Sequence, residues 1–239
     1  MLAVFRRDFK AYFTSAIGYI YLGAYIFVLN LIFFMDNALG GSASVAGAFS
    51  FMMLVMMFVT PILTMRVFSE DLKQKTDQLL LTAPVKLSRI VLGKYLSSLA
   101  VFGCLLGLTL LWPYVISVFG ENNRAEVIGN YAGMFCIGAA YIAMGVFISS
   151  LTENQVIAAV GSLGLFVGLY VLEMIAMYFY QSGALPVFII QALGFISIFG
   201  RYSDISRGVL ALDNMVFFIS VTAIFLFLTV RGLEKRRWA

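Results

Sequence analysis

The sequence contains no histidine, only two cysteines and few charged residues among its 239 positions. Without histidine, the chain has no imidazole general base and no histidine metal ligand. Cys104 and Cys136 lie in apolar runs without the spacing of a ligand pair, so we interpret them as small buried hydrophobic residues. Charged residues make up 12% and hydrophobic residues 62% of the chain, and a water-soluble fold of this size cannot bury that much apolar surface. The composition therefore predicts a polytopic membrane protein.

Charged residues interrupt long apolar runs, and these interruptions locate the membrane spans. A helix needs about 20 apolar residues to cross the hydrocarbon core of a bilayer. We therefore expect an all-α fold with six transmembrane helices in a single membrane domain over residues 1–239. The spans are predicted near residues 16–36, 47–66, 90–118, 129–151, 155–179 and 213–231.

The distribution of lysine and arginine predicts the orientation of the spans, because short cytoplasmic loops carry an excess of both. Thirteen of the sixteen basic residues fall in three sets. These are Arg6, Arg7 and Lys10; Arg66, Lys73, Lys75, Lys86, Arg89 and Lys94; and Arg231, Lys235, Arg236 and Arg237. The other side receives Arg124, Arg201 and Arg207. Both termini are therefore predicted to be cytoplasmic.

The segment 183–212 contains a short apolar piece that could be mistaken for a seventh span. That piece, 187–199, is only 13 residues long, and Pro186 precedes it. A span there would also move the C-terminal basic set to the outer side. We interpret 183–212 as re-entrant or interfacial helices on the outer side, before the last span.

Residues 1–14 have the pattern of a basic amphipathic helix on the cytoplasmic membrane surface. Leu2, Phe5, Phe9, Tyr12 and Phe13 fall on one face at helical spacing, and Arg7 and Lys10 fall outside it. Two interpretations fit this pattern. The helix can be a basic anchor that sets topology, or an elbow helix that contributes to a partner interface.

The segment 69–84, between the second and third spans, has the pattern of a short amphipathic helix. Ser69 is expected to be the N-cap, Glu70 and Asp71 follow where the helix dipole favours negative charge, and Pro84 ends the helix. The apolar face carries Leu72, Thr76, Leu79, Leu80 and Ala83, and the polar face carries Lys73, Lys75 and Asp77. Such a helix can float in the membrane interface or insert into a groove on a soluble partner.

These residues also carry a resemblance to a known family. The run 70–85, EDLKQKTDQLLLTAPV, resembles the first cytoplasmic loop of ABC type-2 exporter permeases, and 90–95, IVLGKY, resembles their entry into the third helix. Residues 202–209, a final span and 233–238 resemble the gliding-motility-associated branch of that family. Lys75 stands where the family usually has glycine, and Gln78 stands where it usually has an acidic residue.

The resemblance implies an N-terminal elbow helix over 1–14, a coupling helix over 69–84, and a position in a bacterial plasma membrane. It implies two copies of a separate ATPase subunit, which bind ATP and magnesium, and a second permease subunit that is the same or a different chain. An accessory membrane or extracytoplasmic protein is also expected in the gliding branch. The implied ATPase-coupling residues are Glu70, Asp71, Lys73, Thr76, Leu79, Leu80 and Pro84.

No catalytic, cofactor or metal site is expected in this chain itself. Its sequence contains no G-x-x-x-x-G-K-[ST] loop, so the ATPase must be another chain. Met52, Met53, Met56 and Met57 are interpreted as adaptable packing, because no histidine or nearby cysteine completes a copper site. The scattered cytoplasmic carboxylates disfavour a membrane enzyme, and the lack of a central intramembrane charge disfavours an ion-driven carrier.

Glu173 is the acidic residue that lies well within an apolar stretch. It follows Asn154 by 19 positions, which places it roughly 28 Å along a helix, near the outer interface. Two roles remain open for it: an interfacial or helix-pairing carboxylate, or part of a translocation path or outer gate.

The leading hypothesis is a permease subunit that exports a hydrophobic or amphipathic substrate. The alternative within the same fold is mechanotransmission, in which ATP hydrolysis drives an extracytoplasmic partner and no substrate crosses the bilayer. Transport assays in sealed vesicles would separate the two.

Overall fold

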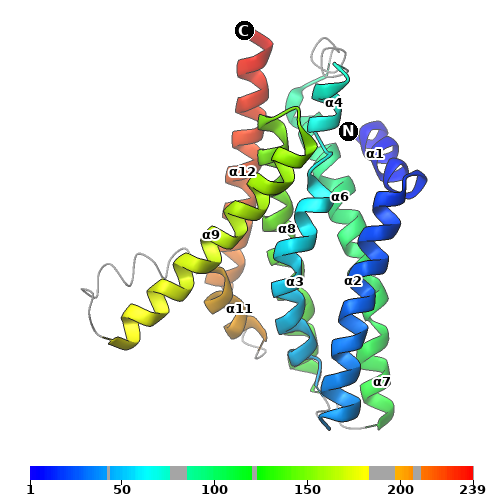
Figure 1. The fold of residues 1–239 in the computed structure, drawn as a ribbon, viewed down its shortest axis with the longest axis vertical. Helices are drawn as coiled ribbons and strands as arrows, with labels where there is room; N and C mark the ends of the chain where they lie inside the picture. The colour runs from blue at the N-terminus through cyan, green and yellow to red at the C-terminus, as the bar shows by residue number, and fades with distance from the viewer. Residues whose placement is uncertain (42–43, 76–84, 120–122, 183–196, 207–210, 239) are drawn as a thin grey trace.

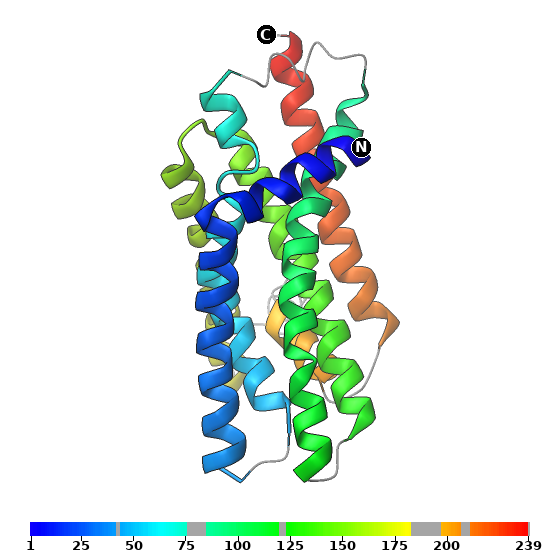
Figure 2. The ribbon, with the colours of Figure 1, turned by 90° about the vertical axis from the view of Figure 1, so that its right-hand side faces the viewer.

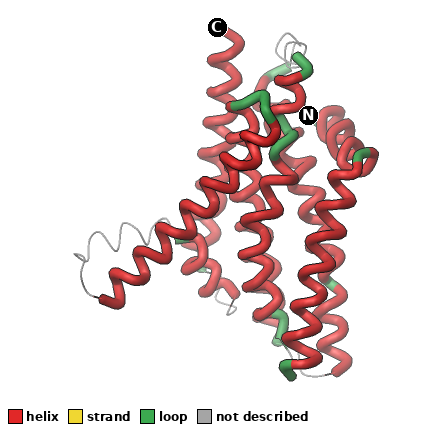
Figure 3. Tube along the Cα trace, in the orientation of Figure 1, coloured by secondary structure: helices red, strands yellow, loops and turns green. Residues whose placement is uncertain are grey.

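The computed structural model describes residues 1–41, 44–75, 85–119, 123–182, 197–206 and 211–238. The described residues fold into helices joined by short turns, and no strand occurs among them (Figure 3). The elements are α1 (Leu2–Thr14), α2 (Ala16–Phe34), the π-helical turn η1 (Met35–Leu39), α3 (Ala46–Thr64), α4 (Ser69–Lys73), α6 (Leu87–Thr109), α7 (Leu111–Phe119), α8 (Arg124–Leu151), α9 (Gln155–Ser182), α11 (Ile198–Ser206) and α12 (Leu212–Trp238). The prediction of an all-α fold is confirmed.

Within these described ranges, six helical stretches are long and apolar enough to cross a membrane. They are Gly18–Leu39, Ala46–Lys73, Leu87–Val118, Arg124–Leu151, Gln155–Tyr180 and Leu212–Arg236. Each overlaps one of the spans expected from the charge-free runs. The prediction of six membrane helices is therefore confirmed, and the chain is a multi-pass membrane protein.

The third span is not the single helix that its apolar run predicts. It breaks at Leu110, where α6 ends and α7 begins. Pro113 explains the break, because proline has no N–H to donate to the carbonyl of Thr109, four residues earlier. The Leu110 N–H instead donates to the Gly107 carbonyl at 3.3 Å, which is the shorter spacing of a terminal turn.

Helix α8 forms the centre of the bundle. In an apolar window of 18 residues within its membrane stretch 67% of the residues are buried, against 17% in the corresponding windows of α9 and α12. Glycines on α8 allow neighbouring helices to approach closely: a Cβ at Gly138 would lie 2.1 Å from the Phe102 ring, and one at Gly145 would lie 2.3 Å from Thr64 Oγ1. The core therefore lies where α8 meets α3 and α6, and α9 leans away from it (Figure 1).

Both termini and α4 lie at the same end of the bundle (Figure 1). Helix α1 crosses the bundle at this end, turned away from the direction of α2 (Figure 2). The change of direction occurs at Ser15, whose backbone is extended with φ −107° and ψ 156°. We call this the basic end, because it brings together residues from all three basic sets of the sequence. The predicted helix over residues 1–14 is present as α1, and its contact with a membrane or partner stays a prediction.

The predicted outer segment 183–212 is described only in part. Residues 198–206 form α11, which lies in the half of the bundle away from the termini (Figure 1). Residues 183–196 and 207–210 lie outside the described residues. The last span begins at Leu212, so the final residue of the predicted segment belongs to α12.

Candidate functional site

Helix α1 is fastened to α3 and α6 through Tyr12, the buried residue of its inner face. The Tyr12 hydroxyl donates to the Leu63 carbonyl at 2.9 Å and lies 2.9 Å from Ser98 Oγ. Burial raises the pKa of Tyr12 to about 12, because the phenolate would lose its hydration. The hydroxyl is therefore neutral at physiological pH and holds α1 against the end of α3 and the middle of α6.

A close approach at Gly93 brings α1 against α6. A Cβ at Gly93 would lie 3.0 Å from the Met1 carbonyl oxygen and 3.2 Å from the Val4 Cβ. Glycine at this position therefore lets the first turn of α1 lie directly on the α6 backbone. This contact places Asp8, one turn further along α1, beside the residue that follows Gly93.

The turn between α3 and α4 is held by a side chain from α8. Ser149 Oγ accepts from the Phe68 N–H at 3.1 Å and from the Ser69 N–H at 3.2 Å, and donates to the Met65 carbonyl at 3.0 Å. Phe68 is the N-cap of α4, and the Ser69 hydroxyl donates backwards to the Met65 carbonyl. The prediction that Ser69 is the N-cap is wrong: Ser69 is the first helical residue, and Ser149 of α8 accepts from its N–H and from that of the N-cap, Phe68.

The prediction of an uninterrupted helix over 69–84 is also wrong. Helix α4 ends at Lys73, and Lys75 has a positive φ of 56°, a left-handed conformation that ends a right-handed helix. This is the position at which the resembled loop usually carries glycine, the residue that adopts this conformation most readily. Residues 76–84 lie outside the described residues, so Thr76, Leu79, Leu80 and Pro84 cannot be placed.

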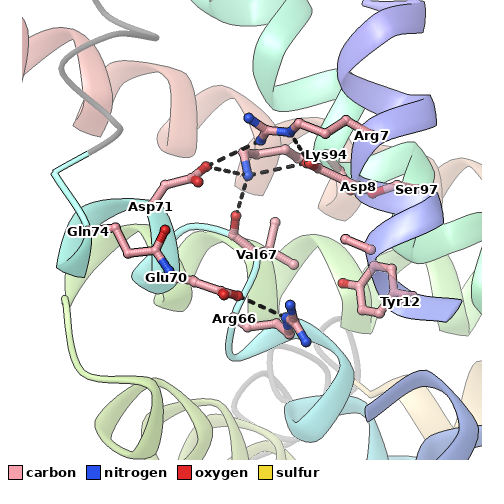
Figure 4. A pocket seen from close by; sticks show the side chains of 11 residues that line it. Arg7, Asp8, Tyr12, Arg66, Val67, Glu70, Asp71, Gln74, Lys94 and Ser97 are labelled. Carbon is pink, nitrogen blue, oxygen red and sulfur yellow. Dashed lines mark hydrogen bonds and ion pairs between the residues drawn. The ribbon is translucent and has the colours of Figure 1, made fainter. Parts of the chain in front are cut away.

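Arg7, Asp8, Asp71 and Lys94 form a charge cluster between α1, α4 and α6, which we call the Lys94 cluster (Figure 4). The Lys94 side chain is only 3% exposed, and its Nζ lies 2.7 Å from Asp71 Oδ2 and 3.2 Å from Asp8 Oδ2. The same Nζ donates to the Val67 carbonyl at 2.6 Å and lies 5.1 Å from the centre of the Phe68 ring. A single ammonium from α6 thus contacts α1, the turn before α4, and α4 itself.

Arg7 and Arg66 complete the charges around this cluster. Arg7 lies 2.7 Å from Asp8 and 3.6 Å from Asp71. Burial lowers the pKa of Arg7, but the hydrogen bond and charge of Asp8, together with Asp71, outweigh it and raise the pKa overall. Arg66 pairs with Glu70 at 3.0 Å and donates to Ser15 Oγ at 3.0 Å, so it joins the α3–α4 turn to the α1–α2 junction.

A cavity of about 260 Å³ opens between these groups, and it is lined by residues from α1, α6 and the α3–α4 segment. The charged side chains that line it are three cations and three carboxylates: Arg7, Arg66, Lys94, Asp8, Glu70 and Asp71. The balance gives no net charge that would attract an anion or a cation. Across the described residues, no group of three or more cysteine, aspartate or glutamate side chains is arranged to hold a metal ion. The arrangement is therefore suited to joining helices.

The outward side of α4 is open. Lys73, Gln74 and Lys75 are exposed, whereas Ser69 and Leu72 are buried. Lys73 also lines a second pocket with Glu153 and Asn154 of the turn between α8 and α9. Of the predicted coupling residues, the structure therefore places Glu70 and Asp71 in the anchored side of α4 and Lys73 on its open side.

Glu173 caps the first turn of α11. Its carboxylate accepts from the backbone N–H groups of Ile198 at 3.2 Å, Phe199 at 3.1 Å and Gly200 at 2.8 Å, and from the Ser197 hydroxyl. A negative charge at a helix N-terminus satisfies unpaired amides and is favoured by the helix dipole. Glu173 thus joins α9 to α11, and its role in a gate stays a prediction.

Three further hydrogen bonds, not anticipated from the sequence, hold α11 in place. The Tyr202 hydroxyl donates to Asn130 Oδ1 at 2.8 Å, and Asn130 Nδ2 donates to the Ser206 carbonyl at 3.2 Å. On the other side, Arg201 donates to Asn214 Oδ1 at 3.1 Å. Helix α11 is therefore attached to α8, α9 and α12 at once.

Comparison with known proteins gives one family. The sequence model described as ABC-2 family transporter protein matches residues 49–238, which include every described element from the body of α3 to the end of α12. Among curated proteins, none matches the chain.

Proposed function

We infer the following from the premise that the chain belongs to the ABC-2 transporter family and is a permease component of an ABC transporter. We propose that it exports an apolar or amphipathic substrate across a bacterial plasma membrane. In this proposal the ATP is hydrolysed by two copies of a separate subunit, and a second permease subunit completes the pathway. Both termini face the cytoplasm.

The observation that carries the proposal is the position of α4. This short helix lies at the basic end between two membrane spans. One side is anchored to the bundle, and Lys73 on the helix and Gln74 and Lys75 directly after it are exposed. The anchored side meets α1, α6 and α8 through Asp71 and the amides that Ser149 caps. If a partner displaces a helix held in this way, the contacts on its anchored side transmit the displacement to the membrane helices.

The sequence supports a separate ATPase. A phosphate-binding loop needs a glycine-rich turn followed by lysine and a hydroxyl residue. Gly93 and Lys94 are followed by Tyr95, and Lys94 Nζ is already engaged by Asp8, Asp71 and Val67. The energy of ATP must then enter from a partner bound at the basic end.

We propose that the Glu173–α11 contact belongs to the outer gate of the same permease. The carboxylate fixes α11 to α9, and α11 is also bound to α8 and α12. A change in the tilt of α9 would therefore shift α11 relative to the other two helices. This gives a route by which movement of the spans could open or close the outer half.

The test of the proposed function is whether the loop after α4 binds an ATPase. Replacing Leu79 and Leu80 with aspartate puts two charges on the predicted apolar face, so the ATPase should no longer co-purify while the chain still inserts in the membrane. The matched control is the pair Leu79→Ile and Leu80→Ile, which keeps the face apolar and should keep the ATPase. Unchanged co-purification with the aspartate variant would contradict the proposal.

A further inference from the structure

Lys94 has an unusual position for a lysine near a membrane span. Its side chain is almost fully buried, and its three N–H donors have three acceptors on other elements: Asp8 on α1, Asp71 on α4 and the Val67 carbonyl in the turn before α4. A buried charge is tolerated only when it is paired and hydrogen-bonded, and ion pairs are stronger where water is excluded. The three elements are therefore held together through one ammonium group.

We propose that Lys94 is a positioning residue that transmits movement of α4 to α1 and α6 during ATP-driven transport. The inference rests on the proposed function, because it assumes that an ATPase displaces α4. It adds that α4 does not act on the membrane helices through α3 alone. The α1 helix and the third span move with α4 because the Lys94 cluster ties them to it.

Two other contacts near this region involve α3 and the turn at residues 65–68. Tyr12 binds the Leu63 carbonyl, which precedes the turn. Ser15 binds Arg66, which lies in the turn and pairs with Glu70 of α4. That turn separates α3 from α4 and can act as a hinge between them. Asp71, by contrast, lies on α4 beyond the turn, and its carboxylate is 2.7 Å from Lys94 Nζ. The Lys94 cluster thus joins α4 directly to α1 and α6, whereas the Arg66–Glu70 pair joins α4 to the turn that precedes it.

The chemistry of the cluster suits a moving joint. The lysine side chain is a flexible four-carbon stem, and its ammonium attracts carboxylates without a strict angular requirement. Asp8 and Asp71 can therefore shift together around Nζ and remain bound to it. The second cation, Arg7, interacts more weakly with Asp71, because its side chain is 51% exposed and the two groups lie 3.6 Å apart.

The experiment measures movement of α1 in the complex with the ATPase. Spin labels at Lys10→Cys on α1 and Lys235→Cys on α12 report one distance, in a background with Cys104→Ala and Cys136→Ala. Lys10 and Lys235 are both exposed and lie outside the cluster. The distance distribution is compared between the nucleotide-free state and a state trapped with ATP and vanadate.

Lys94→Met combined with Asp8→Asn removes one charge of each sign, so that no carboxylate is left buried without a cation. We expect this variant to bind the ATPase and hydrolyse ATP, and to lose the nucleotide-dependent shift in distance that the parent shows. The exchange Asp8→Lys and Lys94→Glu moves the shared cation from α6 to α1, where it can attract both Asp71 and the carboxylate introduced on α6, and it should restore the shift. A purely structural role for Lys94 predicts instead that the shift persists in the Lys94→Met and Asp8→Asn variant as long as that variant folds and binds the ATPase.

Two results would overturn the inference, and they differ in what else they overturn. A full nucleotide-dependent shift in the Lys94→Met and Asp8→Asn variant would refute transmission through Lys94 and leave the proposed function standing. Failure of the parent chain to bind any ATPase would refute the proposed function and the inference with it.

Discussion

Two partly buried carboxylate junctions of this protein are built differently. At the basic end, Asp8 and Asp71 share the ammonium of Lys94, which reaches them from a third helix. In the opposite half, the carboxylate of Glu173 is held by three backbone N–H groups of α11 and the Ser197 hydroxyl. The first junction joins side chains from three elements, whereas the second joins one side chain to the backbone of a single helix.

This difference indicates which junction can move. Charged side chains on flexible stems keep their attraction while helices shift by small amounts, so the Lys94 cluster can stay intact during movement of α4. Backbone amides at a helix N-terminus point in fixed directions, so the Glu173 contact is kept only if α9 and α11 move together. We therefore expect a compliant joint at the basic end and a rigid joint in the opposite half.

The largest effect should come from removing the shared cation. Lys94→Ala leaves Asp8 and Asp71 partly buried with only Arg7 nearby, and removing one partner of a buried ion pair typically costs about 3–5 kcal/mol. Thermal unfolding in mild detergent should show a clear fall in the midpoint. A variant that unfolds at the parental temperature would show that the cluster is not a structural joint.

A smaller loss of stability is expected at the contact between Glu173 and α11. Glu173→Ala removes the cap of α11, and loss of an N-cap costs about 0.5–2 kcal/mol. Glu173→Gln keeps an oxygen that can accept from the same amides, so it should lose less than the alanine variant. The same unfolding assay checks both, and equal losses for alanine and glutamine would show that the charge, not the hydrogen bonds, holds α11.

Tyr12 offers a pH test of how α1 is attached. The pKa of Tyr12 is raised from 10.0 to about 12 by burial, so the folded protein holds the phenolic proton more tightly than the unfolded chain. This contribution to stability is complete below pH 10 and is lost as the pH rises from 10 to 12. Comparison with Tyr12→Phe isolates it, because the phenylalanine variant cannot titrate there. An unchanged difference between the two proteins over this range would contradict the burial of the hydroxyl.

The smallest effect is expected from an exposed ion pair at the same end. Arg231 and Glu234 lie 2.8 Å apart, but their side chains are 63% and 38% exposed. Water and salt screen such a pair, so Arg231→Gln should change stability by less than about 1 kcal/mol. A loss as large as that of Lys94→Ala would show that burial is not what distinguishes the Lys94 cluster.

The membrane helices could be predicted from the sequence because each corresponds to an apolar run between charges, and this pattern is local. The exposure of Lys73 on α4, the burial of Leu72 and the helical structure of residues 1–14 follow from local patterns as well. The break before α7 could have been anticipated from Pro113, which removes a helix hydrogen bond. The end of α4 could have been anticipated from Lys75, where the resembled loop carries glycine.

The joints between helices could not be predicted, because their members lie far apart in the chain. Asp8 and Lys94 are separated by 86 positions, and Ser149 is 80 positions from the Ser69 amide that it caps. In the sequence, Lys94 counts only as a basic residue before an apolar run. Glu173 is unusual in the sequence as a carboxylate within an apolar stretch, but its partners are backbone amides of α11, which every residue type except proline provides. Only the fold shows which charges meet.

In our proposal, α4 connects this permease to an ATPase in another chain. The most direct measurement is purification of the tagged chain in mild detergent from the cells in which it occurs naturally, with mass spectrometry of the proteins that accompany it. We expect an ATPase with a Walker motif to co-purify in stoichiometric amount, at two copies per pair of permease subunits. A chain that purifies without any ATPase under several detergents would contradict it.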